Sequence, residues 1–293
     1  MSVLGQVKAP ARAGAREIAA GKIAEGVVME NRSEDEADVL PMVAPCRDIR
    51  PDAPLRWLKL GWRDLKSAPA ASLAFGGITV VISYLITAAT WFWGNLGLYL
   101  GLVSGFVFVG PWLAMTWYAI SRRLELGQPV CFMASLADAG RAIRGAMVFA
   151  VILIVVLLVW ARAANTMYIF FPQIHNPSWR DLTLFLAAGS AVGAIFSAVV
   201  FAASAFSLPM LLDRQADAVT AVITSINAVL RNKVSVLVWA GIIVSCVVLA
   251  ALSAWIGFLI LMPLLGHATW HAYRETVDAS QWPQSLPPRL ENG

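Results

Sequence analysis

Charged residues are scarce in this sequence. Asp, Glu, Lys and Arg together make up 14% of its 293 residues, where a soluble domain carries about 25%. Hydrophobic residues make up 59%. A soluble fold of this size could not bury that much apolar surface in one core, whereas a lipid bilayer solvates the excess. The scarcity of charge therefore excludes an ordinary soluble protein.

Cysteines and catalytic motifs are also lacking. Cys46, Cys131 and Cys246 lie far apart in the sequence, which excludes a metal-binding cysteine pair and argues against a disulfide framework. The sequence has no phosphate-binding loop, no HExxH motif and no GxSxG motif. We therefore expect a protein that is not an enzyme, with no catalytic residue, no bound metal and no cofactor.

Long apolar segments dominate what is present. A hydrocarbon core about 30 Å thick needs about 20 helical residues, and six segments qualify: Ser72–Trp93, Leu96–Ile120, Ala146–Tyr168, Leu182–Leu208, Val234–Ala254 and Trp255–Tyr273. Gly94-Asn95 predicts the turn between the first two, and Ser253, Ala254 and Gly257 predict a tight turn between the last two. We predict an all-α polytopic membrane bundle of about six transmembrane helices.

The ends of the chain differ from this apolar part. Residues 1–50 show no apolar period and no signal-peptide core, which predicts a disordered cytoplasmic tail. Residues 51–280 form the predicted six-helix transmembrane domain. Residues 281–293 form a second predicted cytoplasmic tail.

Positive charges alternate between the two sides of the predicted bundle. One set of loops carries Arg56, Lys59, Arg63, Lys66, Arg122, Arg123, Arg141, Arg144, Arg214, Arg231, Lys233 and Arg274, and the opposite loops carry only Arg162 and Arg180. Positive loops stay inside the cell, so both termini are expected in the cytoplasm. Basic residues beside membrane spans face anionic lipid, so membrane lipids are expected partners and nucleic acid is not.

The spans also suggest an internal repeat. Gly105–Arg123 and Gly257–Glu275 match at five positions: Gly105/Gly257, Phe106/Phe258, Pro111/Pro263, Leu113/Leu265 and Arg122/Arg274. Pro209 marks a third copy, and a basic amphipathic segment such as Pro54–Ser67 precedes each pair of spans. We predict three helical hairpins with cytoplasmic interfacial helices, and chance similarity among apolar segments is the alternative. The three prolines are expected to kink their helices.

Two further stretches carry a family resemblance. The runs Arg56–Gly76 (RWLKLGWRDLKSAPAASLAFG) and Ser204–Asp217 (SAFSLPMLLDRQAD), together with Ser225–Asn232, resemble the uncharacterised bacterial integral membrane protein family called domain of unknown function 2189. The similarity covers roughly residues 45 to 280. It implies a bacterial inner (plasma) membrane location and carries over no catalytic residue.

Five polar residues are candidates for function. His267 and His271 lie one helical turn apart, near mid-membrane, a spacing that suits a metal or a haem; histidines bonded to a neighbouring helix are the alternative. Asp213, Arg214 and Asp217 follow the fourth span and could form a gating or substrate-binding ion pair, or simply mark a helix end paired with nearby charges. Gly189 and Gly193 have GxxxG spacing, which predicts close helix packing.

Three functional hypotheses follow. The first is a non-enzymatic membrane protein that acts through membrane-protein partners or lipids, and it rests on the missing chemical motifs. The second is a small-solute transporter or channel, suggested by the repeated prolines. The third is a haem- or metal-binding membrane redox component that uses His267 and His271.

Overall fold

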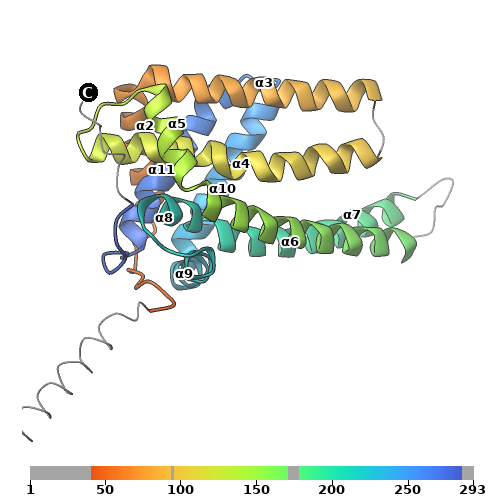
Figure 1. Cartoon of the computed structure of the whole chain (residues 1–293). Helices are drawn as coiled ribbons and strands as arrows, with labels where there is room; N and C mark the ends of the chain where they lie inside the picture. The colour runs from red at the N-terminus through yellow and green to blue at the C-terminus, as the bar shows by residue number, and fades with distance from the viewer. Residues whose placement is uncertain (1–40, 94–95, 171–177, 286–293) are drawn as a thin grey trace, which may run out of the picture. The chain divides into compact units, whose positions relative to one another are not determined.

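The computed structural model describes residues 41–93, 96–170 and 178–285, and this part of the chain is helical (Figure 1). The helices are α2 (Ala53–Ser67), α3 (Pro69–Trp93), α4 (Leu96–Glu125), α5 (Phe132–Arg141), α6 (Ile143–Phe170), α7 (Trp179–Ser204), α8 (Ser207–Asp213), α9 (Ala218–Arg231), α10 (Lys233–Leu252) and α11 (Phe258–Thr276). The described residues form no β-strand and only two isolated bridges. The predicted all-α fold is confirmed.

Four of the six expected spans are confirmed as long apolar helices. Segments long and apolar enough to cross a membrane run over Pro69–Trp93, Arg144–Ala163, Trp179–Asp213 and Lys233–Leu252. Few residues in their most apolar windows are buried within the protein. Apolar side chains that are exposed along the whole length of a helix are favourable in contact with lipid and unfavourable in contact with water.

The other two expected spans differ from the prediction. The side chains of residues 96–109 and the predicted turn Gly94-Asn95 lie outside the described residues, so the first half of the span Leu96–Ile120 is described only as helical backbone of α4. The last span begins at Phe258 and not at Trp255, and α11 is not among the long apolar helices. Its second half carries His267 and Arg274 and is covered by other helices, so it lacks a continuous apolar surface.

The long helices are arranged as antiparallel neighbours. Figure 1 shows α3 beside α4 and α6 beside α7, and each of these pairs is in contact. α11 runs antiparallel to α3, since His267 contacts Ser72 near one end of α3 while Ala254, just before α11, contacts Tyr84 further along it. Gly76 of α3 is buried at this interface, and the missing side chain lets the two backbones approach closely.

A tight turn joins α10 to α11, as predicted from Ser253, Ala254 and Gly257. Ala254 and Trp255 adopt φ values of 50° and 69°, a left-handed conformation that is uncommon outside glycine. The Trp255 amide donates to the Ala250 carbonyl at 2.8 Å, which closes the end of α10. The Tyr84 hydroxyl donates to the Ala254 carbonyl at 2.6 Å and fastens the turn to α3.

The three prolines lie in two different settings. Pro111 and Pro263 lie inside α4 and α11, as expected of helix-kinking residues. Pro209 instead lies in the first turn of α8, after α7 has ended at Ser204. A proline in a first turn removes no intrahelical hydrogen bond, so the chain is interrupted before Pro209 and not bent by it.

The structure describes part of each predicted tail. Residues 1–40 and 286–293 lie outside the described residues, but Ala44 and Cys46 are buried and Trp282 is 3% exposed. Residues 44–50 are fixed to α9 and α10 by Thr224, which accepts from the Ala44 amide, and by Asn232, which accepts from the Ile49 amide. The described parts of the predicted tails therefore contact the helices through isolated side chains that have no period in the sequence.

The order of helices repeats three times along the described chain. Short amphipathic helices α2, α5 and α9 each precede two longer helical stretches: α3 and α4, α6 and α7, and α10 and α11. This is the order expected of three hairpin units with lead-in helices. The sequence repeat itself stays a prediction.

Candidate functional site

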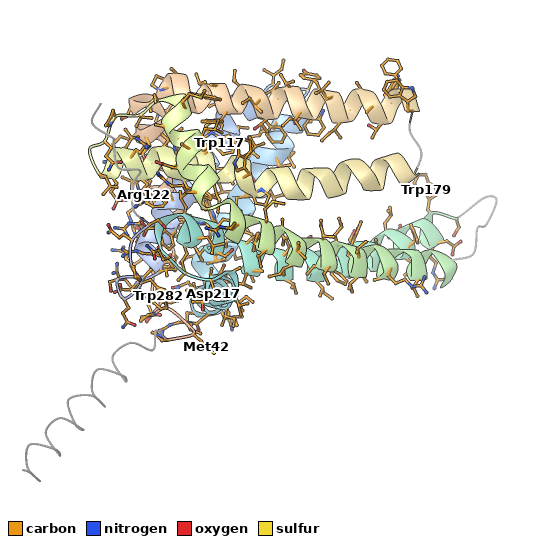
Figure 2. The ribbon with its side chains drawn as sticks, in the orientation of Figure 1. Met42, Trp117, Arg122, Trp179, Asp217 and Trp282 are labelled. Carbon is orange, nitrogen blue, oxygen red and sulfur yellow. The ribbon has the colours of Figure 1, made fainter. Side chains whose placement is uncertain are left out.

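Charged side chains of the described residues gather at one end of the long helices. Figure 2 shows Arg122, Asp217 and Trp282 in this region and Trp179 at the opposite end of the same helices. Trp91, Phe92 and Trp93, which end α3, are all exposed, as aromatic residues at a membrane–water boundary are. We call the first region the polar end.

Asp213 is the centre of the polar end. Its side chain is 6% exposed and accepts from Arg122 Nε at 3.4 Å and from Arg214 Nε at 3.1 Å. The Tyr273 hydroxyl donates to Asp213 at 3.0 Å, and Arg274 Nη1 lies 3.5 Å away. The ion pair predicted for Asp213 and Arg214 is present. The contacts around Asp213 together join α4, α8 and α11, because a buried carboxylate needs several donors to offset its lost hydration.

The same arginines hold the segment after α11. Arg122 Nη2 donates to the Ser285 carbonyl at 2.7 Å, and Arg214 Nη1 donates to the Trp282 carbonyl at 2.9 Å. The Ser285 amide in turn donates to the Asp213 carbonyl at 2.9 Å. Contacts among residues distant in the sequence therefore hold the polar end together. Sequence patterns do not reveal such contacts.

His267 is fully buried between two serines. Its Nε2 lies 2.9 Å from Ser72 Oγ and its Nδ1 lies 2.8 Å from Ser121 Oγ. A neutral imidazole donates from one nitrogen and accepts at the other, and a hydroxyl serves either role. Ser72 is the fourth residue of α3 and Ser121 lies in the last turns of α4, so His267 lies beside the polar end and not halfway along the spans, where we expected it.

His271 pairs with a different helix. Its Nε2 donates to Asp64 of α2 at 2.7 Å, and the Asp64 side chain is 5% exposed. Burial by itself would raise the pKa of the Asp64 carboxyl, but the hydrogen bond and charge of His271, with a hydrogen bond from Ser121, hold that pKa below its ordinary value. The histidine pair therefore links α11 to α2, α3 and α4.

The two histidines have different hydrogen-bond partners, which bears on whether they could bind one metal. Both ring nitrogens of His267 have hydroxyl partners, so a metal bound there would displace one of them. In the part of the chain that the structure describes, no group of three or more His, Cys, Asp and Glu residues is placed to hold a metal ion. Each histidine hydrogen-bonds to side chains of neighbouring helices, as the alternative to a metal or haem site describes.

Asp217 lies apart from this network and caps α9. Its carboxylate accepts from the amides of Val219 and Thr220, both at 2.9 Å. Burial is the largest influence and would raise the pKa of Asp217, but these hydrogen bonds lower it below its ordinary value. Among the residues that the structure describes, no side chain pairs with Asp217 as a gating ion pair would require, whereas the capping role explains its position.

Replacing the Asp217 cap should weaken α9. We expect Asp217→Ala to lower the free energy of unfolding by about 0.5–2 kcal/mol at neutral pH, whereas Asp217→Asn, which keeps an acceptor, should be nearly neutral. Because the folded-state pKa is depressed, the carboxylate's stabilisation is present above its unfolded pKa and is lost as the pH falls through the folded pKa. Unfolding followed by circular dichroism in detergent, at neutral and acidic pH, measures both effects; equal stability of Asp217→Ala and wild type would contradict the capping role.

A basic pocket lies among α4, α5, α6 and α8. It has a volume of about 390 Å³ and is lined by four arginines, Arg122, Arg141, Arg144 and Arg214, and by one carboxylate, Asp138. On sequence alone, Arg122, Arg141 and Arg144 are only orienting charges, and Arg214 is also a candidate ion-pair partner of Asp213. The pairs Arg122-Arg123 and Arg141-Arg144 were the available signal, because they flank the segment that joins the second and third predicted spans and so lie on the same side of the bundle.

A second pocket, of about 430 Å³, contains both signs of charge. Arg63, Asp64, Glu125, His271 and Arg274 are among its lining residues. Arg274 donates to Glu125 from Nε at 3.1 Å and from Nη2 at 2.9 Å, a two-point ion pair. The charges of this pocket are paired with one another, so it presents less net charge than the basic pocket.

Comparison with known proteins agrees with the membrane architecture. A family model described as predicted integral membrane protein (DUF2189) matches residues 98–213. This chain resembles the DUF2189 family. The match contains most of the run Ser204–Asp217, whereas Arg56–Gly76 and Ser225–Asn232 lie outside it.

The DUF2189 description is that of an integral membrane protein and states no activity. No curated protein and no solved structure matches the chain. The residues matched include Arg122, Asp138, Arg141, Arg144 and Asp213, so the basic pocket and the Asp213 network lie largely within the segment that resembles this family.

Proposed function

We propose that this integral membrane protein is non-enzymatic and acts through lipids and membrane-protein partners in the bacterial inner (plasma) membrane. In this proposal the polar end and both termini face the cytoplasm, since Arg122, Arg141, Arg144 and Arg214 gather there. The opposite end carries exposed Trp91–Trp93 and Trp179.

The uncovered surface of α7 carries this proposal. No residue in the most apolar window of the span Trp179–Asp213 is buried inside the protein. Gly189 and Gly193, whose GxxxG spacing predicts a closely packed helix, have no heavy atom within 4 Å of the place where a Cβ would be. The predicted packing is therefore not made by the residues that the structure describes, and among them this surface is open to a second helix or to lipid.

The remaining polar chemistry supports the same proposal. The buried carboxylates Asp64, Asp138 and Asp213 each pair with a cation or a histidine. A groove of about 480 Å³ along α7, α9 and α10 is lined mainly by apolar side chains, with Lys233 at its border. Such a groove suits acyl chains, whereas a solute path needs polar groups along the membrane depth.

Purification in mild detergent followed by native mass spectrometry tests the proposal. We expect a membrane-protein subunit or a phospholipid to remain bound to the wild-type protein. If a helix packs on α7, Gly189→Leu with Gly193→Leu should abolish retention of that subunit, because the added side chains keep the helices apart. Gly241→Leu is the matched control, since Gly241 of α10 also faces open space.

Each outcome has a defined meaning. Loss of a subunit in the α7 variant but not in Gly241→Leu supports a partner on α7. Retention of phospholipid alone supports the lipid part of the proposal. The proposal would be overturned if the wild-type protein reproducibly carried neither subunit nor lipid. It would also be overturned if the protein bound a haem whose Soret band was lost in His267→Ala.

A further inference from the structure

The basic pocket has more positive charge than its carboxylates neutralise. Asp138 pairs with Arg123 at 2.6 Å and also with Arg141, and Asp213 pairs with Arg122 and Arg214. Arg144, which is exposed, makes no ion pair with any described residue. Four arginines of this region therefore share two carboxylates, and Arg144 adds a further positive charge, so positive charge exceeds negative charge around the pocket.

Arg141, which lies outside the spans, lies among these charges. Burial is the main cause that lowers the pKa of Arg141; Asp138 opposes this effect, and repulsion from Arg123 and Arg122 adds to it. An arginine crowded by other arginines is stabilised when an anion enters the space between them. The lining thus favours a negatively charged ligand.

The position of the pocket indicates the source of that ligand. Arg144 is the first residue of the span Arg144–Ala163, and Asp213 is the last residue of the span Trp179–Asp213. The pocket therefore lies at the start of the apolar span Arg144–Ala163, which is where lipid head groups meet a membrane span. Leu211, Leu212 and Ala142 give the pocket an apolar wall next to the arginines.

We propose that this pocket binds the phosphate group of an anionic phospholipid, with Arg144 and Arg141 facing the phosphate and Leu211 and Leu212 against the glycerol region. Guanidinium groups bind phosphate oxygens in two-point hydrogen bonds. Asp213 and the carbonyls of Ser285 and Trp282 hold Arg122 and Arg214 in place, so the positive charges of these two arginines have fixed positions beside the pocket. This inference deepens the proposed function, because it specifies the class of lipid.

The test is a lipid titration of the purified protein followed by native mass spectrometry. The probes are dioleoyl phosphatidylglycerol, dioleoyl phosphatidylcholine and inorganic phosphate. We expect tighter binding of phosphatidylglycerol than of phosphatidylcholine, and Arg144→Gln should weaken phosphatidylglycerol binding about five- to tenfold. Arg144 has no ion pair among the described residues, so its replacement should leave the unfolding temperature unchanged.

Arg162→Gln is the matched control. Arg162 is an exposed arginine of the same helix, α6, towards its other end, so the substitution removes the same charge without touching the pocket. Equal weakening by both variants, or no weakening by Arg144→Gln, would overturn the proposal. Release of phosphatidylglycerol by inorganic phosphate, in wild type but not in Arg144→Gln, would support the phosphate pocket and assign it a soluble ligand.

This titration needs no protein partner. Phosphatidylglycerol binding that depends on Arg144 therefore stands even if no subunit is retained on α7. Conversely, a subunit retained through Gly189 and Gly193 leaves the partner part of the proposed function standing if the titration fails.

Discussion

Asp213→Asn should lower the free energy of unfolding by about 3–5 kcal/mol, which is the range measured when one partner of a buried ion pair is removed. Asparagine keeps nearly the same shape but removes the charge and replaces one acceptor oxygen with an amide donor, so packing is not the variable. Arg122 and Arg214, whose side chains are 7% and 10% exposed, would then remain inside the protein without their carboxylate. Equilibrium unfolding in mixed detergent micelles, followed by circular dichroism, measures the loss.

Asp48→Asn is the control for this substitution. Asp48 pairs with Arg231 at 3.3 Å, but its side chain is 78% exposed. Water screens such a pair, so its removal should change stability by less than about 1 kcal/mol. If Asp213→Asn were no more destabilising than Asp48→Asn, the Asp213 network would not be what holds α4, α8 and α11 together.

The spans were predictable because lipid imposes a requirement of length and composition on each segment separately. The span predicted at Ser72–Trp93 appears within α3, and that predicted at Val234–Ala254 ends two residues earlier, at Leu252. α11 differs because only its first half is apolar. Its second half carries His267, His271 and Arg274, and α2 packs over Ala268 there.

The polar end could be predicted only in part, because its partners are far apart in sequence. Asp213 and Arg214 are adjacent and were identified as a pair. Arg122 lies 91 residues before Asp213 and Tyr273 lies 60 residues after it, and no local pattern joins them. Sequence hydropathy likewise placed His267 at mid-membrane, since it does not record which residue of α3 lies opposite.

The contact between α3 and α11 depends on a single glycine. A Cβ on Gly76 would overlap the carbonyl oxygen of Leu259 and lie 3.1 Å from Pro263 Cγ. Backbone atoms of a helix cannot move aside as a flexible side chain does. The hydrogen bonds from Ser72 to His267 and from Tyr84 to Ala254 lie on either side of this contact, so the helices cannot separate there without straining both.

Gly76→Ala should therefore destabilise the protein by about 1–3 kcal/mol, the usual range for overpacking in a close-packed interior. Gly77→Ala is the matched control, because the nearest atom to its Cβ would be Leu259 Cδ1 at 3.9 Å, an ordinary contact. Both substitutions gain up to about 1 kcal/mol of helix propensity. Gly77→Ala should accordingly be neutral or stabilising, so only Gly76→Ala should lower the unfolding midpoint; equal shifts would show that α3 and α11 are not in close contact at Gly76.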